Sequence, residues 1–362
     1  MTLTRGARIT GAVLYAVLGA VVVCWIVRDV LAVDEPLELL RFWAGYADAH
    51  PGASPATTQT DAVLFAVLAV AGATVRHSTA AAATMVVTGV VAFVLRLPSV
   101  WSAGSSWMDG RYSDELRTRA LVSAFVVLAA ALALIVTGSA GRGQPADAYE
   151  PLPARPAQGA GVVAFLALGT AGAVSVAWEI RRLFVLPDAV YPDWFTGGDA
   201  IPVSLTGAPP GWNSVALSAA CLVAAWTALF RAVHARPLGL TAGGFLLVSG
   251  ALAIAQAAHH EVLEHFGELT LEYQLNVATS FLLALAGAAA LLALAPRGTA
   301  DDRQDPGYGG YGYPPEGYGY PPAGPAPGHG YGYPQPGGTG GFGPPPGAPP
   351  APPPPGPVPP GW

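Results

Sequence analysis

The chain of 362 residues contains no lysine, only two cysteines and few charged residues of any kind. Asp, Glu, Lys and Arg make up 11% of the sequence, against roughly 25% in an average soluble domain. So little charge argues against a soluble globular protein. Hydrophobic residues make up 52% and occur in long blocks, which is typical of a protein whose solvent is a membrane.

Sequence motifs of several common enzyme classes are missing. The chain has no P-loop, no Gly-x-Ser-x-Gly and no Cys-x-x-Cys. No basic patch with interleaved aromatic residues occurs, which argues against nucleic-acid binding. Cys24 and Cys221 lie in apolar stretches and are most simply small core residues, although a disulfide between them is an alternative. We therefore expect no resident cofactor and favour a non-enzymatic protein.

Eight apolar stretches are long enough, or nearly so, to cross a bilayer, for which an α-helix needs about 20 residues. They cover residues 9–30, 61–76, 79–98, 119–138, 159–181, 214–233, 238–258 and 275–296. The pattern predicts an all-α, polytopic integral membrane protein with eight transmembrane helices. The first stretch follows Arg5 and Arg8 as in a signal peptide, but it has no clear cleavage site, and we expect a retained helix.

The two halves of the chain resemble each other at an offset of about 155 residues. The matched landmarks are Trp25 with Trp178, Arg76 with Arg231, 87–89 with 248–250, and 123–125 with 279–281. Each half has an even number of spans, so the repeats would have the same orientation. We expect a first four-helix repeat at 1–140, a linker at 141–157, a second repeat at 158–297 and a tail at 298–362.

Glycines within the stretches are candidate sites of close helix packing, because small residues let helix backbones approach each other in membranes. They are Gly11, Gly19, Gly72, Gly89, Gly169, Gly172, Gly250 and Gly287. An alternative is that they reflect only the amino-acid composition encoded by a GC-rich genome.

Arginine placement predicts the orientation. The short connections at one end each carry arginine, as at Arg76 and Arg231, whereas the opposite connections are longer and more acidic. We therefore expect both termini to be cytoplasmic, in a multi-pass protein of a bacterial inner (plasma) membrane.

Ionisable residues gather at the predicted outer ends of the spans, Asp61 and Arg96 among them, and leave the span centres almost free of charge. We predict an outer-mouth polar cluster made of Arg28, Asp29, Glu179, Arg181, Arg182 and His259. Residues of the two halves could pair across the repeat interface, between the first and fifth spans. Three interpretations stay open: snorkelling at the membrane interface, an outward-facing anion- or ligand-binding cluster, and helix-packing specificity.

The run from His259 to His265 is the most chemically rich segment. On a helix, His260 and Glu264 would share one face, and Glu261 and His265 the adjacent one. This spacing makes His260, Glu264 and His265 a candidate divalent-metal site. The alternatives are a solvated helix extension of the seventh span and a pH-responsive histidine cluster.

The last 65 residues change abruptly to Pro, Gly and Tyr, with Tyr-Gly-Tyr-Pro at 311–314, 318–321 and 331–334. Such a segment cannot bury a core, and we expect disorder with polyproline II character. It would either dock cytoplasmic protein partners or only add solubility. The composition resembles tails on many actinobacterial membrane proteins, a resemblance that carries no function.

Two function classes remain open from the sequence. The first is a non-enzymatic membrane scaffold or sensor with an outward-facing polar cluster and a cytoplasmic interaction tail. The second is a small-solute transporter or channel whose path runs between the two repeats. The scarcity of charge at mid-depth favours the first, because ion and proton pathways usually leave ionisable groups there.

Overall fold

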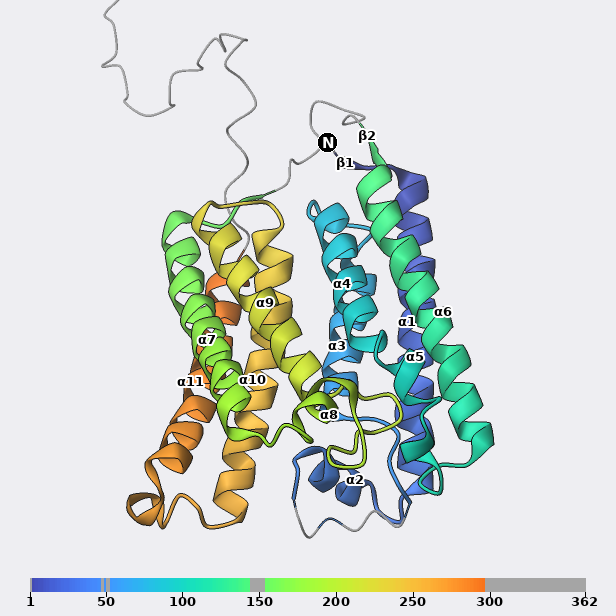
Figure 1. Cartoon of the computed structure of the whole chain (residues 1–362). Helices are drawn as coiled ribbons and strands as arrows, with labels where there is room; N and C mark the ends of the chain where they lie inside the picture. Colours follow the sequence, from blue (N-terminus) through green and yellow to red (C-terminus); the bar gives the residue numbers. More distant parts are fainter. Residues whose placement is uncertain (1, 47–48, 50–52, 144–153, 297–362) are drawn as a thin grey trace, which may run out of the picture. The chain divides into compact units, whose positions relative to one another are not determined.

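The computed structural model describes residues 2–46, 49, 53–143 and 154–296. The predicted tail at 298–362 and most of the predicted linker at 141–157 lie outside these residues. The described part is almost entirely helical, as the sequence predicts, and falls into two four-helix groups that we call the first and second halves (Figure 1).

The first half contains four long helices and three short ones. The long helices are α1 (Arg5–Ala32), α3 (Gln59–Thr74), α4 (Ala81–Arg96) and α6 (Asp114–Ala140). The short ones are α2 (Pro36–Trp43), α5 (Ser99–Ser102) and the 3-10 helix η1 (Ser106–Met108). Two two-residue strands, β1 (Thr2–Leu3) and β2 (Arg142–Gly143), pair antiparallel and join the two ends of this half.

The second half repeats this order with fewer short elements. Its long helices are α7 (Gln158–Val185), α9 (Pro210–Leu229), α10 (Ala235–His259) and α11 (Leu271–Leu294). The short helix α8 (Tyr191–Thr196) follows α7, and the 3-10 helix η2 (Phe266–Glu268) precedes α11.

Among the described residues, seven helices are long and apolar enough to cross a membrane: α1, α4 together with α5, α6, α7, α9, α10 and α11. The predicted second span corresponds to α3, which has 16 residues and is apolar but shorter. Large apolar side chains such as Leu31, Phe184 and Leu292 are more than three-quarters exposed on the helices. Exposed apolar surface on this scale suggests a membrane protein.

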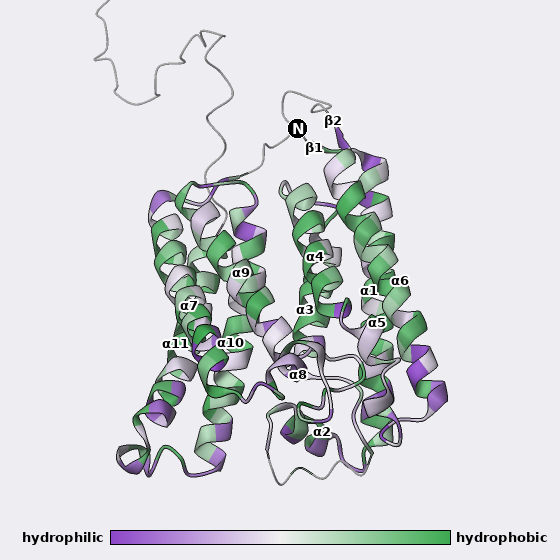
Figure 2. Cartoon of the chain, viewed as in Figure 1, coloured by the Kyte–Doolittle hydropathy of each residue, from purple (hydrophilic) through white to green (hydrophobic). Residues whose placement is uncertain are grey.

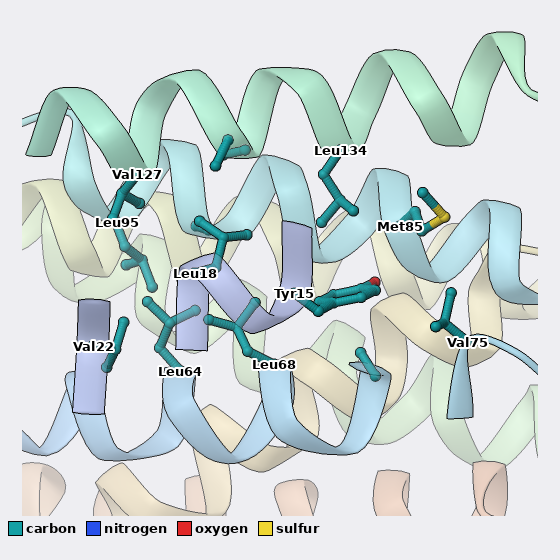
Figure 3. Packing of buried hydrophobic residues seen from close by; sticks show 14 of the residues in the cluster. Tyr15, Leu18, Val22, Leu64, Leu68, Val75, Met85, Leu95, Val127 and Leu134 are labelled. Carbon is teal, nitrogen blue, oxygen red and sulfur yellow. The ribbon is translucent and has the colours of Figure 1, made fainter. Parts of the chain in front are cut away.

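Each helix bundle has its own hydrophobic core. In the first, Leu18 and Val22 of α1 pack with Leu64 and Leu68 of α3 beneath α4 and α6 (Figure 3). Within this core, the hydroxyls of Tyr15 and Thr88 are hydrogen-bonded at 2.7 Å, so both buried polar groups are satisfied. The second core is built mainly from alanines and leucines of α7, α9, α10 and α11.

The third and fourth helices of each half pack closely through glycines. A Cβ added at Gly89 of α4 would lie 2.9 Å from the carbonyl oxygen of Ala131 in α6. One added at Gly250 of α10 would lie 2.4 Å from the backbone nitrogen of Ala284 in α11. Gly11, Gly72, Gly172 and Gly287 also leave no free space for a side chain, as predicted, whereas Gly19 and Gly169 have room.

The halves meet through α10, which contacts α3 and α4, and through α9, which contacts α4. Phe245 of α10 belongs to the first core, and Leu217 and Val248 pack against it. The sequence placed the seam between the first and fifth spans. The helices that form the described seam are instead α3 and α4 on one side and α9 and α10 on the other, and the residues named here are apolar.

The helical bundle has two distinct ends. We call one the polar-loop end, which carries α2, α5, η1, α8 and η2. The other is the terminal end, which carries β1, β2 and the turns at 75–80 and 230–234. Figure 2 shows apolar residues along the helices and hydrophilic residues gathered towards the ends.

The close contact between α10 and α11 makes a prediction about stability. Gly250→Ala places a methyl group against the backbone of Ala284 and should destabilise the protein by about 1–3 kcal/mol, the usual cost of overpacking. Gly244→Ala in the same helix meets nothing within 4 Å and should be neutral or slightly stabilising. Unfolding in detergent measures both; equal midpoints for the two variants would contradict the close contact.

Candidate functional site

A buried carboxylate near the end of α1 organises the loop that leads into α3. Asp29 is fully buried. Its carboxylate accepts hydrogen bonds from the backbone N–H of Ala56 at 3.1 Å and of Thr57 at 2.7 Å, and from the Thr57 hydroxyl at 2.5 Å. Arg28 pairs with the same carboxylate at 2.7 Å. Four donors therefore satisfy a charge that is removed from water.

A second buried charge lies at the start of α3. Asp61 is 2% exposed and pairs with Arg96, at the end of α4, which is 4% exposed; the closest nitrogen and oxygen are 2.5 Å apart. Asp61 also accepts the backbone N–H of Thr58 at 2.8 Å and thereby caps its own helix. One carboxylate thus joins the ends of two antiparallel helices.

The second half completes this ion pair. Arg96 donates to the carbonyl oxygen of Thr206 at 2.6 Å. The Thr206 hydroxyl lies 2.8 Å from the carbonyl oxygen of Ala56 and 3.1 Å from Asp61 Oδ2, and the Thr206 N–H donates to the same Ala56 carbonyl. We call Asp29, Ala56, Thr57, Asp61, Arg96 and Thr206 the buried charge network.

Aromatic side chains make further hydrogen bonds at the polar-loop end. The Tyr112 hydroxyl donates to the carbonyl oxygen of Pro55 at 2.8 Å. Burial raises the pKa of the Tyr112 phenol and so keeps this donor protonated. Trp101 donates to the Thr196 carbonyl at 2.9 Å, and Trp212 donates to the Val94 carbonyl at 2.8 Å. Both indoles bridge the two halves at the polar-loop end.

The other predicted cluster residues of the second half form a separate group. Glu179 pairs with Arg182 and accepts the indole N–H of Trp194 at 3.0 Å. The Arg182 guanidinium carbon lies 4.6 Å from the centre of the Trp194 ring. Arg181 pairs with Glu272 at 2.6 Å on the surface. These residues pair within their own half, as do Arg28 and Asp29, in place of the pairing across the halves that the sequence suggested.

His259 forms a further contact between the halves. Its ring stacks on Tyr46 with centroids 4.0 Å apart and an interplanar angle of 4°. One turn earlier in α10, the Gln256 side chain donates to the Gly45 carbonyl at 2.7 Å. The end of α10 is therefore attached to the segment that follows α2.

The expected helical face at 259–265 is absent. The helix α10 ends at His259, and His260 is its cap. Glu261 then adopts a positive φ of 55°, which an α-helix cannot contain, so His260, Glu264 and His265 lose the spacing on which the metal hypothesis depends. Across the residues that the structure describes, no three His, Cys, Asp or Glu side chains converge as metal ligands. Cys24 and Cys221 are both free thiols, and the alternative of a disulfide between them is wrong.

Sequence reasoning placed Asp61 and Arg96 at span ends but left both out of the predicted cluster, and it missed Thr206. The run Thr58-Gln59-Thr60-Asp61 has the spacing of a capping box, a local signal that could have placed Asp61 in the first turn of a helix. Thr206 lies in a loop 110 residues after Arg96, and nothing in the local sequence signals their contact.

No protein-family model, curated protein or solved structure matches the chain. The arrangement of its own residues is therefore the basis for a functional hypothesis.

The buried ion pair makes a prediction. Asp61→Asn leaves the Arg96 guanidinium buried without a counter-charge and should destabilise the protein by about 3–5 kcal/mol. Removing both charges with Asp61→Asn and Arg96→Gln should recover part of that loss, because no unpaired charge remains.

The matched control is the exposed pair of Glu115 and Arg119 in α6. Glu115→Gln should change the unfolding free energy by less than about 1 kcal/mol. The same denaturation assay measures all three variants; an Asp61→Asn effect as small as the control would show that the pair is not buried in the folded protein.

Proposed function

We propose that this protein is a non-enzymatic membrane scaffold or sensor whose recognition surface is its polar-loop end. The observation that carries the proposal is the buried charge network, in which Thr206 of the second half completes the ion pair of Asp61 and Arg96 in the first. The loops of both halves thereby form one connected layer.

The energetics of the network support a role beyond stability. A buried ion pair contributes little net stability, because desolvation of both charges offsets their attraction. Ionisable residues at the edge of, or within, a membrane are functional candidates for the same reason. A network that fixes loops from two bundles in a single arrangement suits a surface that must recognise a partner.

The helices α3 and α4 offer a mechanical link from this layer to the opposite end. Asp61 and Arg96 lie at their polar-loop ends. Their connecting turn is held at the terminal end by Arg8, which donates to the carbonyl oxygens of Arg76 at 2.9 Å and Ser78 at 3.2 Å. A partner that shifts the ion pair would move both helices and so displace the turn that connects them.

We further propose eight spans and a same-orientation repeat. At 1.5 Å per residue, α3 is about 24 Å long, and local thinning of the bilayer can accommodate such a short span. The matched landmarks Trp25 and Trp178 each donate to a hydroxyl on the fourth helix of their half, Ser123 and Thr279, both at 3.0 Å. Equivalent hydrogen bonds at equivalent positions support a duplication.

The orientation and the tail complete the proposal. We place the terminal end in the cytoplasm of a bacterial cell, since its connections carry arginines such as Arg76, Arg142 and Arg231. The tail would then present its Pro- and Tyr-rich sequence to cytoplasmic proteins, as polyproline segments do for aromatic-lined grooves.

The sensor hypothesis predicts a long-range effect of Arg96→Gln. Hydrogen exchange should accelerate at the amides of 203–207, which lose their anchor, and also at 76–78 on the far side of the α3–α4 pair. Hydrogen-exchange mass spectrometry in detergent measures both, with Arg119→Gln as the control. A change confined to the polar-loop end would contradict signal transmission.

The orientation predicts which side reaches a cysteine probe. In a background with Cys24→Ala and Cys221→Ala, Ser106→Cys in η1 should react with an impermeant maleimide from outside the cell. Gly159→Cys, exposed at the start of α7, should react only after the membrane is opened. The reverse pattern would overturn the proposed topology.

A further inference from the structure

A groove of about 700 Å³ runs along the first half between α1 and α3. Its lining includes Ala16, Gly19 and Val23 of α1 and Phe65, Leu68 and Gly72 of α3. Small residues leave the space: a Cβ added at Gly19 would meet only Phe65, at 3.9 Å. The volume lies within the roughly 300–1,000 Å³ typical of ligand sites.

The two ends of this groove differ in chemistry. Most of its length is apolar, but Arg76 and His77 line it at the terminal end, where both are exposed. Within the residues that the structure describes, the Arg76 guanidinium makes no hydrogen bond or ion pair. A mostly apolar groove that ends at the Arg76 guanidinium matches a molecule with a long apolar chain and an anionic headgroup.

We infer that this groove binds an anionic phospholipid, with one acyl chain between α1 and α3 and the headgroup phosphate at Arg76 and His77. Basic pockets at helix ends are a known way of holding anionic headgroups, and an arginine can extend its side chain towards the interface while its stem stays among apolar groups. The acyl chain supplies the van der Waals contacts that the glycine and alanine surfaces otherwise lack.

The second half contains a natural comparison. A groove of about 740 Å³ lies between α7 and α9, the equivalent pair of helices, and includes Phe165, Gly169, Leu222 and Trp226 in its lining. No charged residue belongs to that lining as the structure describes it. This groove can accept an acyl chain but has no means of selecting a headgroup, so headgroup preference should belong to the first half alone.

Native mass spectrometry of the detergent-solubilised full chain tests the inference, with phosphatidylglycerol and phosphatidylcholine as competing probes. The wild type should retain phosphatidylglycerol preferentially. Arg76→Gln with His77→Gln should reduce that preference by about fivefold or more. One basic residue near an anionic headgroup strengthens binding by roughly fivefold. Arg5→Gln, an exposed arginine at the same end but outside the groove, should leave the preference unchanged.

A second pair of variants tests the apolar part. Gly19→Leu fills the first groove and should remove the preference for phosphatidylglycerol, whereas Gly169→Leu fills the second and should leave that preference unchanged. Retention of the headgroup preference in the Arg76 and His77 variant would overturn the inference, as would a preference for phosphatidylglycerol that persists in a folded Gly19→Leu protein. The outcome is independent of the buried charge network, which lies at the other end of α3.

Discussion

The ion pair between Asp61 and Arg96 is the interaction on which the polar-loop end depends. Removed from water, the two charges gain from each hydrogen bond that nearby groups supply. The Thr58 amide and the Thr206 hydroxyl donate to Asp61, and the Thr206 carbonyl accepts from Arg96, so each brings a segment of backbone into place. The ion pair thus fixes the start of α3, the end of α4 and a loop of the second half together. The buried Asp29 carboxylate likewise accepts hydrogen bonds from the loop at 55–57, through the backbone N–H groups of Ala56 and Thr57.

The two halves share an internal plan and differ in what they present. In both, the first helix packs against the second and the fourth, and the third packs against the fourth. Glycines bring the third and fourth helices together, and a tryptophan joins the first helix to the fourth. The differences lie at the ends: the first half has the buried charges and a groove with a cationic end, while the second has surface ion pairs and a groove without charge.

The sequence predicted the fold well wherever a property was local. The eight apolar stretches all became helices. Their limits differ from the expected ones by one to five residues: α1, α6, α7 and α10 extend at both ends, α3, α9 and α11 begin and end earlier, and α4 is shorter. Glycines such as Gly89 and Gly250 mark close contacts as expected. Contacts that depend on distant segments were not predictable: Thr206 gives no local signal, and its role arises only when α9 and α10 pack against α3 and α4. The helical spacing expected from His259 to His265 failed because Glu261 turns the chain.

The position of Thr206 also bears on how the protein is made. Asp61 and Arg96 leave the ribosome together with the first helices, but the segment that completes their hydrogen bonds follows more than 100 residues later. Without the segment that carries Thr206, Asp61 and Arg96 lack the hydrogen bonds to its hydroxyl and carbonyl oxygen. The strands β1 and β2 pair the two ends of the first half with each other and need no residue of the second half. A chain with a defective second half would therefore leave Arg96 without its hydrogen-bond acceptor on Thr206.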